Sequence, residues 1–290
     1  YDVYNKGQIG DEEFEYFGRH VGGIVGRLSG DIEKAYNTGA IYNGYSVVGG
    51  IAGWVFKGNI NNSFNTGNIT VYNQNSHSSQ VGGIAGAAQG GNGIFINNVY
   101  NLGTLRSFDV GYGNNSVGGI LGTATQAGTV TINNAYTTGN LYSGKLDKQT
   151  NTFKEDLKIV ETYKDGNLTG VNTKINSIYG SYEYNASVVV GDYTYYIQPD
   201  NDENGNPLFT KLTGRHDLAR HSVEFSNKSD YEYEFDGGIT EPTGGDVDED
   251  SAWRIYGGNT PILNAFLPNS EDYFSNSENM AGIGSIQYGT

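Results

Sequence analysis

Three residues in the second half of the chain have the types and spacing of calcium ligands. Asp200, Asp202 and Asn204 stand at alternate positions before Gly205, which matches the Asp-x-Asp-x-Asn-Gly start of a calcium loop. Calcium requires such oxygen ligands and a glycine for the sharp turn. The twelfth position is Lys211 instead of glutamate, and a plain hairpin turn uses the same residue types. We therefore prefer a bare turn and keep calcium as the alternative, with no other cofactor expected.

Other clusters of ligating or ionisable residues are weaker candidates. His216 and His221 are five residues apart and lack the glutamate of the metalloprotease helix motif. The acidic run at 246–250 is typical of a solvated linker. Tyrosines in the second half, such as Tyr182, Tyr184, Tyr195 and Tyr231, could bind a sugar or a protein, although edge-strand packing is the preferred interpretation. We assign no catalytic residue.

The composition limits the classes of fold and partner. The formal net charge is −15 at pH 7 and the 17 Lys and Arg residues form no basic cluster, which argues against nucleic acid as a partner. No run of about 20 apolar residues could insert into a membrane. Cysteine is absent, so the chain forms neither disulfides nor thiolate metal sites. The 44 glycines and 5 prolines favour tightly turned β structure.

Two short blocks alternate along the first half of the chain. The first block, Val-Gly-Gly-Ile-x-Gly, occurs four times, at 21–26, 48–53, 81–86 and 117–122. The second block has a central aromatic residue, isoleucine four residues before it and Ile or Leu five residues after it. Its complete copies are centred on Tyr36, Phe64, Tyr100 and Tyr136. The unit therefore repeats every 27 to 36 residues, a period typical of stacked or solenoid architectures.

This repeat predicts an all-β fold, specifically a right-handed parallel β-helix with a β-rich extra-helical insertion. Each unit offers three short strands and three corners, which is one coil, with two smaller coils per unit as the alternative. The first block suits a short strand between two tight bends. A glycine three residues after each aromatic, such as Gly67, marks a corner that needs positive φ or close backbone approach.

The spacing in the second block predicts which side chains stack. Ile60 and Phe64 are four residues apart, so we expect both on one strand face and place that face inward. Later repeats carry two adjacent asparagines between these positions, and one of each pair should form a stacked amide ladder. The first repeat has Glu33 and Lys34 there instead, so the ladder should end at that repeat.

Three segments are expected along the chain. The chain opens in mid-pattern at Tyr4, which indicates a piece of a longer protein. Charge is concentrated after Gly144, and strand-like sequence returns at 175–197. We expect β-helix repeats at 1–144, a β-rich insertion or extra-helical module at 145–250, and closing strands at 251–290 that cap or rejoin the β-helix.

Both blocks and the closing segment resemble parts of large bacterial surface proteins. Val-Gly-Gly-Ile-x-Gly followed by Tyr-Asn-Thr-Gly-x-Ile resembles GLUG-type repeats. The segment from Trp253 to Leu263 is similar to the Trp-Arg-Ile-Tyr-Glu-Gly-x-Thr-x-Pro-Leu-Leu signature of filamentous-haemagglutinin-type exoproteins, with Gly257 in place of the glutamate. The resemblance covers a little over half of the chain. It implies an adhesin of a two-partner secretion system, secreted and displayed on the bacterial cell surface.

Three functions remain open. The leading one is a non-enzymatic adhesin fragment, a shaft that presents loops or a small module to a glycan or protein on a host or bacterial surface. Binding would then lie in the variable insertions at 72–80 and 108–116 or after residue 144. A carbohydrate-active lyase or glycosidase needs clustered carboxylates, and only Asp31, Glu33 and Asp109 are acidic between 21 and 144. A purely structural spacer is the third.

Overall fold

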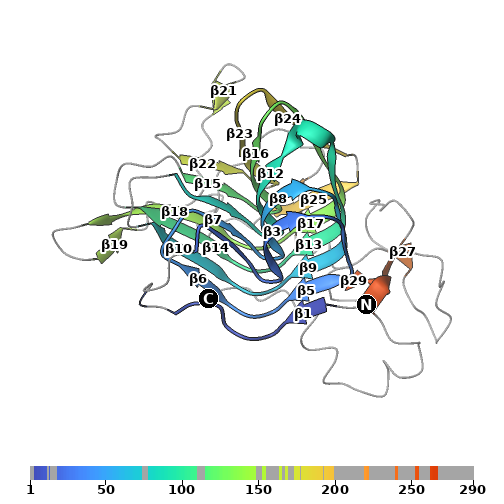
Figure 1. Cartoon of the computed structure of the whole chain (residues 1–290), viewed down its shortest axis with the longest axis horizontal. Helices are drawn as coiled ribbons and strands as arrows, with labels where there is room; N and C mark the ends of the chain where they lie inside the picture. The colour runs from blue at the N-terminus through green and yellow to red at the C-terminus, as the bar shows by residue number, and fades with distance from the viewer. Residues whose placement is uncertain are drawn as a thin grey trace.

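The part of the chain that the structure describes is almost entirely β-strand. The computed structural model describes residues 3–11, 13, 18–73, 78–109, 115–147, 152–154, 163–164, 167–168, 173–176, 178–191, 193–198, 219–221, 239–240, 252–254 and 262–266. Within these ranges the helical elements are two 3-10 turns, η1 (Gly90–Asn92) and η4 (Asn264–Phe266). The fold is therefore all-β, and most strand pairs are parallel (Figure 1).

Four sheets, here named A to D, contain most of the strands. Sheet C consists of β2 (His20–Gly22), β7 (Val47–Gly49), β11 (Gln80–Gly82), β15 (Asn115–Gly118) and β22 (Thr173–Asn176). Sheet D consists of β3 (Val25–Ser29), β8 (Ala52–Lys57), β12 (Ala85–Gln89), β16 (Leu121–Thr125) and β23 (Tyr179–Tyr182).

Sheets A and B follow in each repeat. Sheet A contains β1 (Val3–Asn5), β4 (Ile32–Glu33), β5 (Ala35–Asn37), β9 (Ile60–Asn65), β13 (Ile94–Asn101), β17 (Gly128–Thr137), β24 (Ala186–Val190), β25 (Thr194–Gln198) and β26 (Ala219–His221). Sheet B contains β6 (Ile41–Asn43), β10 (Ile69–Asn73), β14 (Leu105–Asp109), β18 (Leu141–Asp147) and the antiparallel β19 (Thr152–Lys154).

Two small sheets complete the described strands. A hairpin pairs β20 (Tyr163–Lys164) with β21 (Asn167–Leu168). The other sheet contains β27 (Ile239–Thr240), β28 (Trp253–Arg254) and β29 (Ile262–Leu263).

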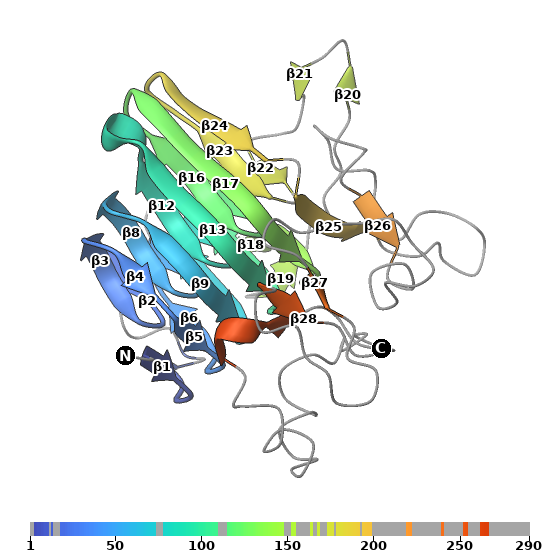
Figure 2. The ribbon, with the colours of Figure 1, turned by 90° about the vertical axis from the view of Figure 1, so that its right-hand side faces the viewer.

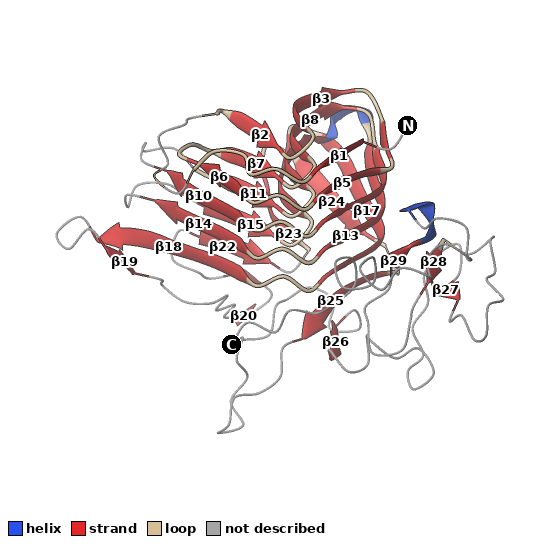
Figure 3. Cartoon of the chain, turned by 90° about the horizontal axis from the view of Figure 1, so that it is seen from below, coloured by secondary structure: helices blue, strands red, loops and turns tan. Residues whose placement is uncertain are grey.

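Each repeat contributes strands to sheets C, D, A and B in that order, one to each except that the first repeat gives both β4 and β5 to sheet A. The next repeat adds the adjacent strand (Figure 3). Equivalent residues are paired, as in the series Ile60, Ile96 and Ile132. One repeat unit therefore spans the four sheets once. The prediction of three strands per unit is wrong, because the first block is not one strand. It bends at Gly83 and Ile84, between β11 and β12, and so contributes two strands.

Strands β22 to β25 pair with strands of the fourth repeat in sheets C, D and A. The strand-like sequence at 175–197 is thereby confirmed as strand in β22 to β25, and these strands extend the same three sheets. The proposed boundaries at residues 144 and 250 stay a prediction.

The apolar interior lies between the sheets and is formed by the branched side chains of both blocks. Val81 and Ile84 of the first block are fully buried in it, as are Ile96 and Leu105 of the second. The aromatic residues belong to a separate cluster. The prediction that isoleucine and aromatic share an inward face is therefore wrong.

A left-handed residue in the middle of each sheet A strand explains this error. Lys34, Asn62, Asn98 and Asn134 have φ of 60°, 46°, 51° and 52°. Asparagine tolerates this conformation better than most residues, and the strand alternation shifts across it. Ile96 and Val99 consequently both point into the core, whereas Tyr100 points outward.

A second row of asparagines, directly after the aromatics, is buried in the interior. Asn37 Nδ2 donates to Asn65 Oδ1 at 2.8 Å, and Asn65 Nδ2 donates to Asn101 Oδ1 at 2.8 Å. Asn65 Nδ2 also donates to the Gly67 carbonyl at 2.8 Å. The row continues to Asn5 at one end and to Thr137 at the other. These buried amides satisfy one another, as buried polar groups must.

Asn65→Ala should lower the free energy of unfolding by about 2 to 4 kcal/mol, because it leaves buried polar groups of the neighbouring asparagines and of Gly67 without partners. Chemical denaturation measures this loss. Asn61→Ala is the matched control, since its half-exposed side chain forms no hydrogen bond with the described residues, and its effect should stay within about 0.5 kcal/mol. Equal losses in the two variants would contradict a structural role for the interior row.

The corner glycines of the second block are required by close backbone approach. A Cβ on Gly67 would lie 2.1 Å from the Gly39 carbonyl oxygen, and one on Gly103 would lie 2.1 Å from that of Gly67. Because these neighbours are backbone atoms of stacked strands, neither can move aside without opening the sheet. A Cβ on Gly30 would meet nothing within 4 Å.

Gly67→Ala is therefore expected to destabilise the chain by about 3 kcal/mol or more, through this steric clash. Gly30→Ala should be neutral or stabilising by up to about 1 kcal/mol, because alanine lowers the entropy of the unfolded chain. Parallel denaturation curves test the pair. A Gly67→Ala variant as stable as Gly30→Ala would show that the close approach is not obligatory.

Candidate functional site: the outer face of sheet A

The outer face of sheet A carries a continuous stack of aromatic rings, here called the aromatic ladder. Its rings are Tyr4, Tyr36, Phe64, Tyr100 and Tyr136, with successive centroids 5.2, 5.0, 4.8 and 5.1 Å apart. Neighbouring rings are inclined by 11° or less. The spacing follows from the distance between adjacent strands in a sheet, so the stack is a direct product of in-register pairing (Figure 2).

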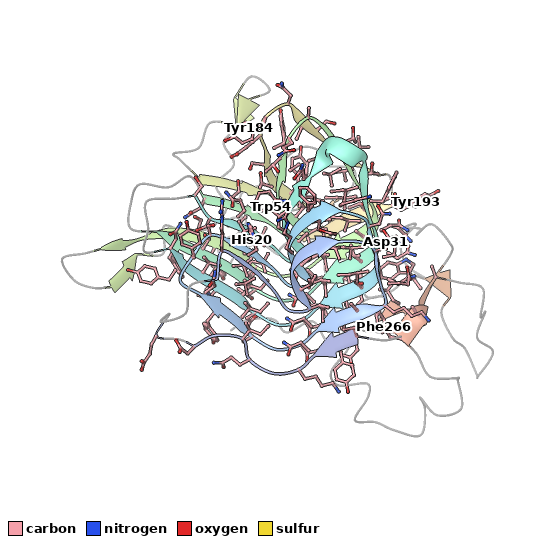
Figure 4. All side chains as sticks on the ribbon, viewed as in Figure 1. His20, Asp31, Trp54, Tyr184, Tyr193 and Phe266 are labelled. Atoms are coloured by element: carbon pink, nitrogen blue, oxygen red, sulfur yellow. The ribbon has the colours of Figure 1, made fainter. Side chains whose placement is uncertain are left out.

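A separate segment lies over this ladder. We name the described residues 252–254 and 262–266 the clasp. The Trp253 ring lies 6.1 Å from Tyr100 and 5.7 Å from Tyr136. Phe266 meets Tyr36 and Phe64 edge-on, at 5.6 and 5.0 Å (Figure 4). Trp253 is fully buried, as is Leu263 in the same cluster. The described residues of the clasp therefore cover the aromatic ladder.

A row of amides runs beside the aromatic ladder on the same face. Asn98 Nδ2 donates to Asn62 Oδ1 at 3.0 Å, and Asn134 donates to Asn98 in the same way. Asn62 Nδ2 in turn donates to the Glu33 carboxylate. The predicted amide ladder is thus confirmed on the second asparagine of each pair, and it ends at Glu33 as expected.

The remainder of this outer face carries neutral side chains that are exposed or half-exposed, with Glu33 in register at one end. It comprises the first asparagines Asn61, Asn97 and Asn133 and the column Phe95, Thr131 and Val189, and we call this surface the amide face. The exposed fractions of Phe95 and Val189 are 54% and 50%. The amide nitrogens of Asn61 and Asn97 donate to none of the described residues, so they are available to a ligand. Free amides beside exposed apolar groups suit a neutral, hydroxyl-rich ligand or a polar protein surface.

Two of the acidic residues lie at one end of the amide face and are engaged in hydrogen bonds. Asp31 Oδ1 accepts from the Asn59 backbone nitrogen at 2.8 Å and from its Nδ2 at 3.1 Å. The Glu33 carboxylate accepts a hydrogen bond from Asn62 Nδ2. Asp109 belongs to β14 in sheet B, where it pairs with Asn73 and with Lys145. The acids that a lyase or glycosidase would have to combine therefore belong to different sheets.

Most of the metal candidates from the sequence lie outside the described residues. This holds for Asp200, Asp202 and Asn204, for His216 and for the acidic run at 246–250. His221 ends β26, where its backbone pairs with Gln198. Within the ranges given above, no group of three His, Cys, Asp or Glu side chains could hold a metal ion.

The predicted binding insertions are only partly described, since residues 74–77 and 110–114 fall outside the described ranges. Tyr182 and Tyr184 are exposed, as a sugar- or protein-binding role would require, at the end of β23 and in the following turn. Sequence reasoning missed the amide face, although the asparagine pairs that form it were recognised. The sequence did not reveal the left-handed conformation of the second asparagine in each pair, which determines that the first asparagine faces outward.

A second polar cluster lies where sheets C and D meet at the first repeat. His20 on β2 packs edge-on against Trp54 on β8, with ring centroids 4.6 Å apart (Figure 4). The Arg27 guanidinium lies over the Phe56 ring at 4.3 Å, an attractive cation–π geometry. Burial lowers the pKa of His20 below its usual 6.5, and the nearby charges of Arg19 and Arg27 lower it further.

The depressed pKa of His20 predicts a pH dependence of stability. Above pH 6.5 the imidazole is neutral in both the folded and unfolded chain. As pH falls below 6.5 the unfolded chain takes up the proton first, so stability is lost until pH reaches the lower folded pKa. The thermal midpoint of the native protein should therefore fall more steeply across this window than that of His20→Gln. Superimposable midpoint curves for the two proteins would contradict the assignment.

Comparisons with protein-family models, with curated proteins and with solved structures found no match for this chain. The described residues contain no helix that is long and apolar enough to cross a membrane. The function is therefore argued from the sheets and from the outer face of sheet A.

Proposed function

We infer that the chain is a fragment of a secreted bacterial surface adhesin whose shaft is a right-handed parallel β-helix. The proposal is supported by the strands that each repeat contributes to four parallel sheets, paired in register from repeat to repeat. The GLUG-type blocks and the closing signature suggest delivery by two-partner secretion to the cell surface. The shaft would hold its attachment surface away from the cell.

The observation that carries the binding function is the amide face. Asn61 and Asn97 offer amide nitrogens that donate to none of the described residues, next to Phe95, an exposed ring, while Asn97 Oδ1 accepts from Asn133 Nδ2 at 3.4 Å. Sugars are recognised by this combination, because amides hydrogen-bond hydroxyl groups and a ring covers the apolar side of the sugar. A neutral glycan on a host or bacterial surface is the ligand class that fits best, and a polar protein surface is the second. The residues of this face include no Lys or Arg, and the carboxylates of Asp31 and Glu33 lie at its end, so nucleic acid is an unsuitable partner.

Asn97→Asp should weaken attachment by at least about tenfold, because it removes an amide donor and places a charge on a neutral surface. Binding of the purified chain to a glycan array and to whole bacterial and host cells measures this. Asn140→Asp is the matched control, since Asn140 lies at the corner before β18, away from the amide face. It should bind like the native chain.

The other outcomes distinguish the remaining functions. Consistent absence of binding by the native chain would favour a structural spacer. Cleavage of a polysaccharide, lost on substitution of Asp31 or Glu33, would favour a carbohydrate-active enzyme and overturn the non-enzymatic adhesin. Binding that is equally weakened by Asn97→Asp and Asn140→Asp would place the ligand elsewhere on the chain.

A further inference from the structure

We propose that the aromatic ladder is a docking surface for the clasp of a second copy of this chain as well as for its own, so that two copies exchange clasps. This inference concerns association between copies and is independent of the proposed adhesin function. Its three supports are the way the clasp is attached, the periodicity of the ladder and the length of chain that leads to the clasp.

The clasp is held on sheet A by side chains. Within the described residues, β28 pairs in parallel with β27 and antiparallel with β29, and with no strand of sheet A. The anchors are Trp253, Leu263 and Phe266, which pack in one cluster with the ladder rings. A small sheet that satisfies its own strand pairing can leave and dock again as a unit, because no ladder of backbone hydrogen bonds with sheet A must be broken.

The surface that the clasp contacts is a set of four consecutive ladder rings. Trp253 contacts the two rings Tyr100 and Tyr136, and Phe266 contacts the preceding two, Tyr36 and Phe64. The two anchors therefore need four consecutive rings. Any molecule that presents four stacked rings at this spacing offers the same surface, and the identical ladder of a second copy does so.

The chain that leads to the clasp is long enough for exchange. Strand β26 ends sheet A at His221, and β27 of the small sheet begins at Ile239. The intervening residues 222–238 span at most about 60 Å when extended. The clasp makes the same contacts in either arrangement. Intramolecular docking therefore prevails at low concentration, and the fraction of chains in the exchanged dimer increases as the concentration rises.

A complementation experiment with full-length chains tests this directly. One variant, Trp253→Ser with Phe266→Ser, keeps the ladder and loses the clasp anchors. The other, Phe64→Ser with Tyr100→Ser, keeps the clasp and loses the central rings. Sedimentation velocity should show each variant as a monomer and their mixture as a 1:1 dimer. A control with Phe95→Ser and Val189→Ser loses two apolar side chains from the same face but keeps its ladder, so its own clasp stays engaged and it should form far less dimer with the clasp variant.

A peptide keeps the proposal testable if the ladder variant does not fold. A synthetic peptide of residues 252–266 should bind the clasp variant, whose ladder is uncovered, and should not bind the native chain. Trp54 is then the only tryptophan left in the protein, so a shift of the peptide's emission to shorter wavelength reports burial of its own tryptophan. The peptide with Trp253→Ala should bind at least about tenfold more weakly.

Two results would overturn clasp exchange. The first is that the clasp variant and the ladder variant, both folded, remain monomers when they are mixed. The second is a peptide that fails to bind the clasp variant, or that binds the native chain equally well. Dimerisation of the clasp variant alone would also count against it, because that chain lacks the anchors on which the exchange depends.

Discussion

The fold depends on a contact between the two repeated blocks in the interior. The second glycine of the first block lies against the buried asparagine of the second block in the same layer. A Cβ on Gly50 would lie 2.5 Å from Asn65 Cγ, and one on Gly83 would lie 2.4 Å from Asn101 Cγ. Only glycine leaves room for the amide, and the amide row adds side-chain hydrogen bonds between neighbouring layers and to the corner carbonyls. The two blocks therefore have to recur in phase, because each supplies half of one buried contact.

A single left-handed residue per repeat determines which side chains of sheet A face the core and which face outward. Ile96 and Val99, on either side of Asn98, both send apolar side chains into the core, and Tyr100 beyond them is turned outward. The central rings of the second block are consequently kept out of the core cluster. The rings that are excluded from it form the ladder on the outer face, and the clasp is the apolar cover that the ladder requires.

The stacking could be predicted from the sequence, whereas the direction of the rings could not. Alignment of the copies maps directly onto strand register, so the amide ladder and its end at Glu33 followed from spacing alone. The inward assignment of Phe64 failed because alternation was counted through Asn62, whose φ of 46° shifts it. Asparagine permits the left-handed conformation without requiring it, and Lys34 adopts the same conformation in the first repeat, so the residue types do not fix the position of the shift. The first block was misjudged for a related reason: its glycines permit a bend within the block as easily as at its ends.

The contact between the clasp and the ladder, and the amide face, could not be predicted from the sequence for a different physical reason. The cover of the ladder comes from residues that lie more than a hundred positions away from most of the rings, and no periodicity connects them. A search for function in the variable insertions follows the general rule that loops carry binding. Here the regular face itself is chemically distinctive, because in-register stacking repeats every outward side chain at the strand spacing. One exposed asparagine per repeat is an ordinary surface residue, but several at that spacing, beside a ring and without charges, form an extended surface that no single repeat possesses. Repetition, rather than any one residue, is what makes this face the proposed binding surface.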